Sequence, residues 1–166
     1  MLRRRQLLAA SVTTLPFFAA LSGCDGRDLL PGLASPPPLS ADVRALFAAV
    51  AAEEDLVSLY KRTVAAYSAL APALTPLLAE HLAHLAQLRA RIIEPPGKRV
   101  PHTVTSRPPV PAAPAAAVAL LRAAERAAST DQLRRLNGAA PSLAQLYASI
   151  AASEATHVAA LDHSPA

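Results

Sequence analysis

The last part of the chain, residues 142–162, has the pattern of an amphipathic helix whose buried face carries two ionisable side chains. Apolar residues recur there every three or four positions, which places them on one stripe of an α-helix. Glu154 and His157 stand in this stripe where apolar residues are due, and they are neighbours on that face. Burying an unpaired carboxylate is costly, so the rest of the fold must supply partners for both side chains.

Two earlier segments also combine an apolar stripe with inward-facing ionisable residues. The first is expected to begin after Ser40, a suitable N-cap, and to continue for about thirty residues. Glu53 or Glu54 interrupts its stripe. The second is expected to begin at Thr75 and Pro76, an N-cap followed by a first-turn proline. Its stripe contains Glu80, His81 and His84, of which we expect His84 and one of the other two to face inward.

A third such helix is expected to run from near Pro114 to Asn137 and Gly138, a residue pair suited to ending a helix. Glu125 occupies a position in its apolar stripe, and the polar run 129–131 could mark a kink or a break. The residues before this helix, 94–114, contain seven prolines, which exclude a regular element. A connection of about twenty residues is unusual in a compact domain. It is expected, however, where the second and third helices of a bundle run parallel.

Nothing in the sequence indicates β-structure. There is no run of alternating β-rich residues, and aromatic residues make up only 4 % of the chain. Alanine dominates the composition, which favours helices and allows them to pack closely. The predicted fold class is therefore all-α, a four-helix bundle over residues 40–162 with a long crossover between helices 2 and 3.

The amino-terminal residues resemble a bacterial export signal. Three arginines at positions 3–5 precede an uncharged apolar run over residues 7–21. At about fifteen residues this run is too short for a comfortable transmembrane helix and suits a signal peptide. It ends in Leu21-Ser22-Gly23-Cys24, which resembles the lipobox of bacterial lipoproteins.

These features predict a lipid-anchored protein. We expect a lipoprotein signal peptide over residues 1–23, lipidation of Cys24 and a proline-rich tether over residues 24–39. Cys24 is the only cysteine, so an intramolecular disulfide is excluded. Arg4 and Arg5 also resemble a twin-arginine motif, so export by the general secretory or the twin-arginine route stays open.

Charge argues against nucleic acid as a partner. Removal of residues 1–23 takes away three of the 16 basic residues and leaves 13 against 12 acidic ones. The mature chain is then nearly neutral and has no basic patch with interleaved aromatic residues. We expect an extracytoplasmic protein attached to the cell membrane through the lipidated Cys24. Long bundles often pair, although no exposed apolar stripe is visible here, so a homodimer stays open.

Each of the four predicted helices places an ionisable side chain on its buried face near mid-helix. Carboxylates brought together repel each other unless protons or cations neutralise them. Carboxylate oxygens and imidazole nitrogens are suitable ligands for one or two divalent ions, which predicts a site for iron, manganese or zinc. The alternative is a metal-free structural or binding module in which these residues form an internal polar network. The candidate ligands are Glu53, Glu54, Glu80, His81, His84, Glu125, Glu154 and His157.

Over roughly residues 40–162 the chain resembles a ferritin-like domain. In that family, one glutamate from each of two helices and a Glu-x-x-His motif from each of the other two hold a dimetal centre. The run from Glu154 to His157 matches one such motif, and Tyr60 stands where many members place an aromatic residue. Glu53 (or Glu54) and Glu125 match the single acids. Together with the lipobox, the run 150–157 is similar to uncharacterised ferritin-like domains of bacterial envelope lipoproteins.

The second helix departs from the family pattern, because the residue three positions after Glu80 is Ala83 and not histidine. Either His81 replaces the acid in a His-x-x-His pair with His84, or Glu80 and His84 serve together. Fewer carboxylates would favour zinc or a single ion over a di-iron pair, or would mean that metal binding has been lost. The resemblance points to reactions with oxygen or peroxide in some members, but it identifies no substrate and leaves enzymatic activity undecided.

Overall fold

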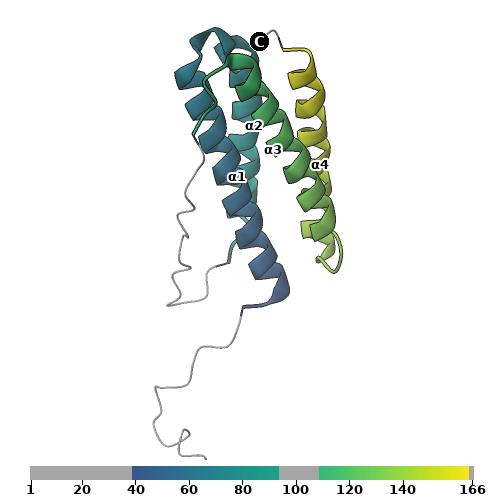
Figure 1. Cartoon of the computed structure of the whole chain (residues 1–166). Coiled ribbons are helices and arrows are strands. Elements are labelled where there is room, and N and C mark those ends of the chain that lie inside the picture. Colours follow the sequence, from purple (N-terminus) through teal and green to yellow (C-terminus); the bar gives the residue numbers. More distant parts are fainter. Residues whose placement is uncertain (1–38, 94–108, 165–166) are drawn as a thin grey trace, which may run out of the picture. The chain divides into compact units, whose positions relative to one another are not determined.

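A computed structural model describes residues 39–93 and 109–164, which belong to one compact unit. The expected signal peptide, the tether up to residue 38 and most of the proline-rich connection lie outside the described residues. Within these residues the chain is all-helical and contains no strand (Figure 1). None of the described helices is long and apolar enough to cross a membrane. The elements are α1 (Ala41–Ala66), the short 3-10 helix η1 (Ser68–Leu70), α2 (Ala71–Arg89), α3 (Pro114–Arg135) and α4 (Pro141–Asp162).

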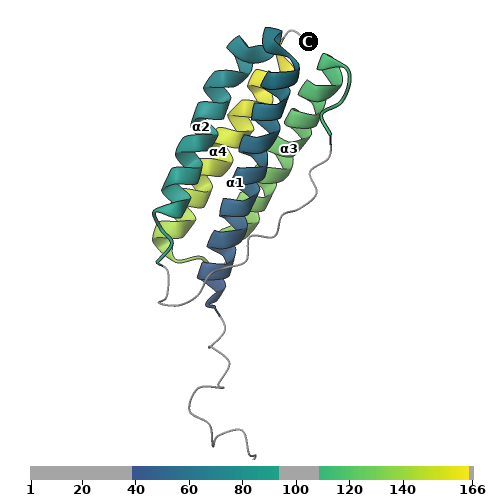
Figure 2. The ribbon, with the colours of Figure 1, turned by 90° about the vertical axis from the view of Figure 1, so that its left-hand side faces the viewer.

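The four helices lie side by side in a bundle (Figures 1 and 2). Helix α1 packs against α2 and α3, and α4 packs against the same two helices. The core consists of two apolar clusters that lie at different levels along the bundle. The first apolar cluster contains Leu46, Ala49, Val50, Val57, Leu85, Leu88, Leu146, Tyr147 and Ile150. The second apolar cluster contains Leu59, Tyr60, Leu70, Leu74, Val118, Leu121 and Leu161.

Membership of the two clusters gives the directions of the helices. The first cluster joins the beginning of α1 and of α4 to the end of α2. The second joins the end of α1 and of α4 to the beginning of α2 and of α3. Helices α1 and α4 therefore run in one direction, and α2 and α3 run in the other. Helix α2 ends at one end of the bundle and α3 begins at the opposite end.

The start of α2 differs from the sequence-based expectation. Helix α2 begins at Ala71, so Pro76 lies inside it and Thr75 is not its N-cap. The earlier start is possible because Pro72 fills the first turn, where a missing N–H costs nothing. It also buries Leu74 completely in the second apolar cluster. Helix α4 begins at Pro141, which again occupies the first turn.

The third helix is not broken at residues 129–131, since α3 is continuous from Pro114 to Arg135. Its two hydroxyl residues are satisfied without breaking the helix. Ser129 donates across to the carbonyl oxygen of Ala151 in α4 at 2.9 Å. Thr130 donates to the carbonyl oxygen of Arg126 one turn earlier at 2.8 Å. Ser129 therefore ties α3 to α4.

Candidate metal centre

A layer of ionisable side chains separates the two apolar clusters. We call Glu53, His81, Glu125, Glu154 and His157 the polar layer; all five are buried, and His157 is the most accessible of them at 1 %. Every helix contributes to it, because each sequence places at least one of these residues on the stripe that faces the core. The heptad-like packing that buries the apolar clusters therefore also buries the polar layer.

His81 lies between two carboxylates. Its Nδ1 is 2.9 Å from Oε2 of Glu53, and its Nε2 is 2.7 Å from Oε1 of Glu125. Burial lowers the pKa of His81, but the hydrogen bonds to Glu125 and Glu53 outweigh this effect and raise the pKa from 6.5 to about 9. In the absence of a metal ion, His81 is therefore an imidazolium that links α1, α2 and α3.

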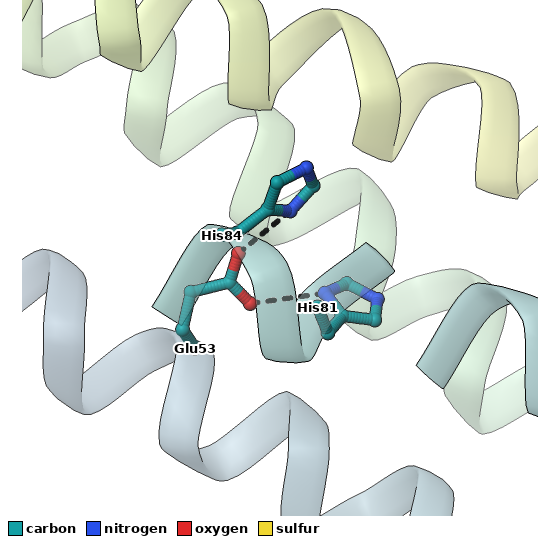
Figure 3. Close-up of side chains that lie close together, drawn as sticks. All are labelled: Glu53, His81 and His84. Carbon is teal, nitrogen blue, oxygen red and sulfur yellow. Dashed lines mark hydrogen bonds and ion pairs between the residues drawn. The ribbon is translucent and has the colours of Figure 1, made fainter. Parts of the chain in front are cut away.

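Glu53 is hydrogen-bonded to both histidines of α2. His84 Nδ1 lies 3.0 Å from Oε1 of Glu53, while His81 occupies the other carboxylate oxygen. Figure 3 shows the two imidazoles projecting from the same face of α2 toward this carboxylate on α1. The side chain of His84 is 12 % exposed, so this pair lies nearer the surface than the rest of the site. Burial raises the pKa of Glu53, but the hydrogen bonds to His81 and His84 hold it below its ordinary value.

Only one oxygen of Glu125, Oε1, lies close to hydrogen-bond donors. Its Oε1 accepts from the hydroxyl of Tyr60 at 2.5 Å and lies 3.5 Å from Nδ1 of His157, in addition to its contact with His81. Its Oε2 is buried without a hydrogen-bond partner. Burial raises the pKa of Glu125, but the hydrogen bonds to His157 and His81 lower it to about 2. This carboxylate is therefore ionised and has one oxygen free for a further ligand.

Glu154 is the unpaired carboxylate of the polar layer, since both of its oxygens are buried without any hydrogen-bond partner. Burial and the nearby charges of Glu53 and Glu125 raise its pKa to about 8. His157, one turn later on α4, directs Nε2 toward Oε2 of Glu80 at 3.0 Å. No described side chain donates a hydrogen bond to Glu154, so this carboxylate needs a proton or a bound cation as its partner.

Glu80 and Glu54 both lie outside the buried layer, in different ways. The side chain of Glu80 is 53 % exposed, yet it reaches the layer through His157 and also accepts from Ser153 Oγ at 2.9 Å. Glu54 points away from the layer and pairs with Arg89 at 2.6 Å. Of the two adjacent acids on α1, Glu53 is therefore the one at the site. Among the three candidates on α2, His81 and His84 face the layer and Glu80 lies at its edge.

Sequence reasoning missed Ser153 and Arg135. Arg135 is partly buried, its NH1 has no hydrogen-bond partner, and its charge acts on Glu154. The sequence pattern could have indicated the position of Arg135, because Glu125, Gln132 and Arg135 follow one another at helical spacing on one face. Ser153 is one turn before His157 and so lies beside it.

The polar layer and the neighbouring His84 contain two groups of three possible ligands, in each of which the ligand atoms lie within 4.8 Å of one another. One group consists of Glu53, His81 and His84. The other consists of His81, Glu125 and His157. Oxygen and nitrogen ligands of this kind suit zinc, iron and manganese. The arrangement can therefore hold a divalent ion between the helices, with Tyr60 hydrogen-bonded to one of the ligands.

Comparison of the chain with protein-family models, with curated proteins and with solved structures finds no match. The function must therefore be argued from the chemistry of the polar layer.

Proposed function

We propose that this protein binds a divalent transition-metal ion (iron, manganese or zinc) in the polar layer of a ferritin-like bundle. The carboxylate of Glu154 carries the proposal, because both of its oxygens are buried without a hydrogen-bond partner. It lies near two other buried carboxylates, Glu53 and Glu125, whose charges act on it unfavourably. A bound cation would neutralise these acids and would give the free oxygens of Glu154 and Glu125 a partner.

The ferritin-like assignment is supported by the directions of the helices and by the placement of the site residues. One buried glutamate comes from α1 and one from α3, and α4 provides the Glu154-x-x-His157 pair. Helix α2 provides His81 and His84 where the family pattern has Glu-x-x-His. The change from a carboxylate to an imidazole reduces the negative charge at the site. It therefore favours zinc, or a single ion, over two iron ions.

A metal-free binding or structural module is the second candidate, and one observation favours it. An unbroken chain of hydrogen bonds runs from Tyr60 through Glu125, His81 and Glu53 to His84. Such a chain can hold a bundle in one register without any ion. It leaves Glu154 outside, however, and Glu154 must then remain protonated.

We also propose that the bundle is held at the outer face of the cell membrane through a lipid on Cys24. The support comes from the sequence alone, namely the arginine-led apolar run and the lipobox that ends at this cysteine.

Elemental mass spectrometry of the purified protein after mild dialysis tests metal binding. Loss of the ion from both Glu154→Ala and His157→Ala, with retention in the control Glu54→Ala, would support the site. The control is matched because Glu54 is also a glutamate at mid-helix, but points away from the layer. Less than about a tenth of an equivalent in the wild type, with no thermal shift on adding iron, manganese or zinc, would refute metal binding.

A further inference from the structure

His81 belongs to both groups of possible ligands, and this limits how many ions the layer can hold. A neutral imidazole has one lone pair, because its other nitrogen carries a proton. His81 would use Nδ1 in the group with Glu53 and His84, and Nε2 in the group with Glu125 and His157. Neutral His81 therefore serves one group at a time. If the layer binds metal as proposed above, the two groups compete for a single ion.

We call His81, Glu125 and His157 the inner group, and Glu53, His81 and His84 the outer group. The hydrogen bond between His157 and Glu80 favours the inner group. A histidine that binds a metal ion usually donates its other ring N–H to a carboxylate, carbonyl or water, which fixes the ring and its tautomer. His81 Nδ1 faces the carboxylate of Glu53 at 2.9 Å. His157 Nε2 faces the carboxylate of Glu80 at 3.0 Å. Because carboxylates accept only, His157 Nε2 carries a proton, and His157 Nδ1 is left for an ion. Both nitrogens of His81 face carboxylates, so His81 Nε2 is left for an ion when Nδ1 keeps its proton toward Glu53.

Those two nitrogens converge on the same carboxylate. Nε2 of His81 lies 2.7 Å and Nδ1 of His157 lies 3.5 Å from Oε1 of Glu125. Neighbouring ligand atoms on one ion with metal–ligand bonds of about 2.1 Å are separated by roughly 3.0–3.4 Å. The spacing of these atoms is therefore already close to that of a coordination shell. An ion would replace the proton that His81 now holds against Glu125.

Glu154 is the candidate for the remaining ligand, and its oxygens would have to approach the ion, because neither group of ligand atoms within 4.8 Å includes them. It is one turn before His157 on α4, its two oxygens have no partner, and the charges of Glu125 and His81 act on it. An ion in the outer group would lie beside the partly exposed His84 and would leave both oxygens of Glu154 without a partner.

We infer that the layer holds a single metal ion bound by His81 Nε2, His157 Nδ1, Glu125 and Glu154, and that Glu53 and Glu80 are positioning residues that orient the two histidines. The inference rests on the proposed metal binding and differs from a dimetal centre in both the number of ions and the role of Glu53. His84 has no part in coordination and serves to hold Glu53 in place.

Cobalt(II) titration of the metal-free full-length protein tests this inference, because the visible absorption of cobalt reports its ligands. The wild type should bind one equivalent. Glu125→Gln, Glu154→Gln and His157→Gln should lose the cobalt spectrum. Glu53→Gln and Glu80→Gln should keep one equivalent with an affinity about 10- to 100-fold lower. Glu53→Asp keeps a carboxylate on a side chain that is one methylene shorter, so it should bind cobalt more tightly than Glu53→Gln does. His84→Gln should keep the wild-type spectrum.

A wild-type measurement guards against variants that do not fold. Carbethoxylation of His84 by diethyl pyrocarbonate, followed by peptide mass spectrometry, should proceed at the same rate with and without zinc, because His84 is not a ligand. Two equivalents of cobalt would overturn the inference, as would protection of His84 by zinc. Loss of the spectrum in His84→Gln but not in Glu154→Gln would assign the ion to the outer group. No binding of any ion by the wild type would instead refute the proposed function.

Discussion

The metal-free protein should become less stable as the pH rises from about 5 to about 9, because buried groups of the polar layer, above all Glu154 and His81, have raised pKa values. The pKa of Glu154 is about 8 in the fold and 4.5 ordinarily. The pKa of His81 is about 9 in the fold and 6.5 ordinarily. Between the two values of each group, the folded state holds more protons than the unfolded state, so the free energy of unfolding decreases with pH.

The two groups act over overlapping ranges. His81 contributes stability that is fully present below its ordinary pKa of 6.5 and is lost as the pH rises through about 9. Glu154 does not destabilise the fold while it is protonated in both the folded and the unfolded state. Above pH 4.5 it ionises in the unfolded state, and the folded state becomes progressively less stable relative to it. A pKa difference of one corresponds to about 1.4 kcal/mol, so Glu154 alone accounts for a loss on the order of 4 kcal/mol between about pH 5 and pH 9.

Urea denaturation of the chelator-treated protein at a series of pH values measures this loss directly. Glu154→Gln has nearly the shape of glutamate but cannot ionise, so its stability should fall far less over the same range. The control Glu54→Gln removes a carboxylate that pairs with Arg89 outside the layer, and it should follow the wild-type profile. A pH profile of Glu154→Gln that is parallel to that of the wild type would show that Glu154 is not held protonated, and would refute the electrostatic reasoning.

Three further outcomes are expected. Tyr60→Phe removes the hydroxyl that donates to Glu125 and should lower the free energy of unfolding by roughly 2 kcal/mol in urea denaturation; an unchanged midpoint would mean that this bond adds nothing. Gly138→Ala should cost about 1 kcal/mol, because φ is +79° at this position although nothing lies within 4 Å of the added methyl group; equal melting temperatures would contradict this. Cys24→Ser should move the protein from the membrane fraction to the soluble fraction, and retention in membranes would instead indicate an uncleaved signal anchor.

Much of the fold could be predicted from the sequence because the helical period is strong. The four helices and the absence of strands in the described part follow from apolar stripes and proline punctuation. The start of α2 was predicted wrongly because Pro72 and Pro76 both satisfy the local rule for a first-turn proline. Only tertiary packing, which buries Leu74, decides between them. Local capping rules cannot weigh that contribution.

The site was harder to predict than the fold, since a stripe shows which residues face inward but not which atoms meet. Helical spacing leaves Glu53 and Glu54 equally suitable, and packing alone directs Glu54 to Arg89. Helical spacing also does not show that Glu80, which is exposed, reaches His157 from the edge of the layer. That His81 contacts α1 and α3 at once depends on the relative rotation of three helices, which no periodicity in one of them encodes.

The polar layer itself argues against a purely structural role. Replacing a buried ionic network by well-packed apolar residues is often neutral or stabilising. Here apolar clusters lie on both sides of the layer, so apolar residues in its place would join them into one core. A network that only fixed the register of the helices would pair every carboxylate, as the chain from Tyr60 to His84 does. Glu154 is unpaired, and it is the residue that such a role leaves unexplained. The proposed cation between α3 and α4 would supply its missing partner, at the point where the two buried histidines and Glu125 already converge.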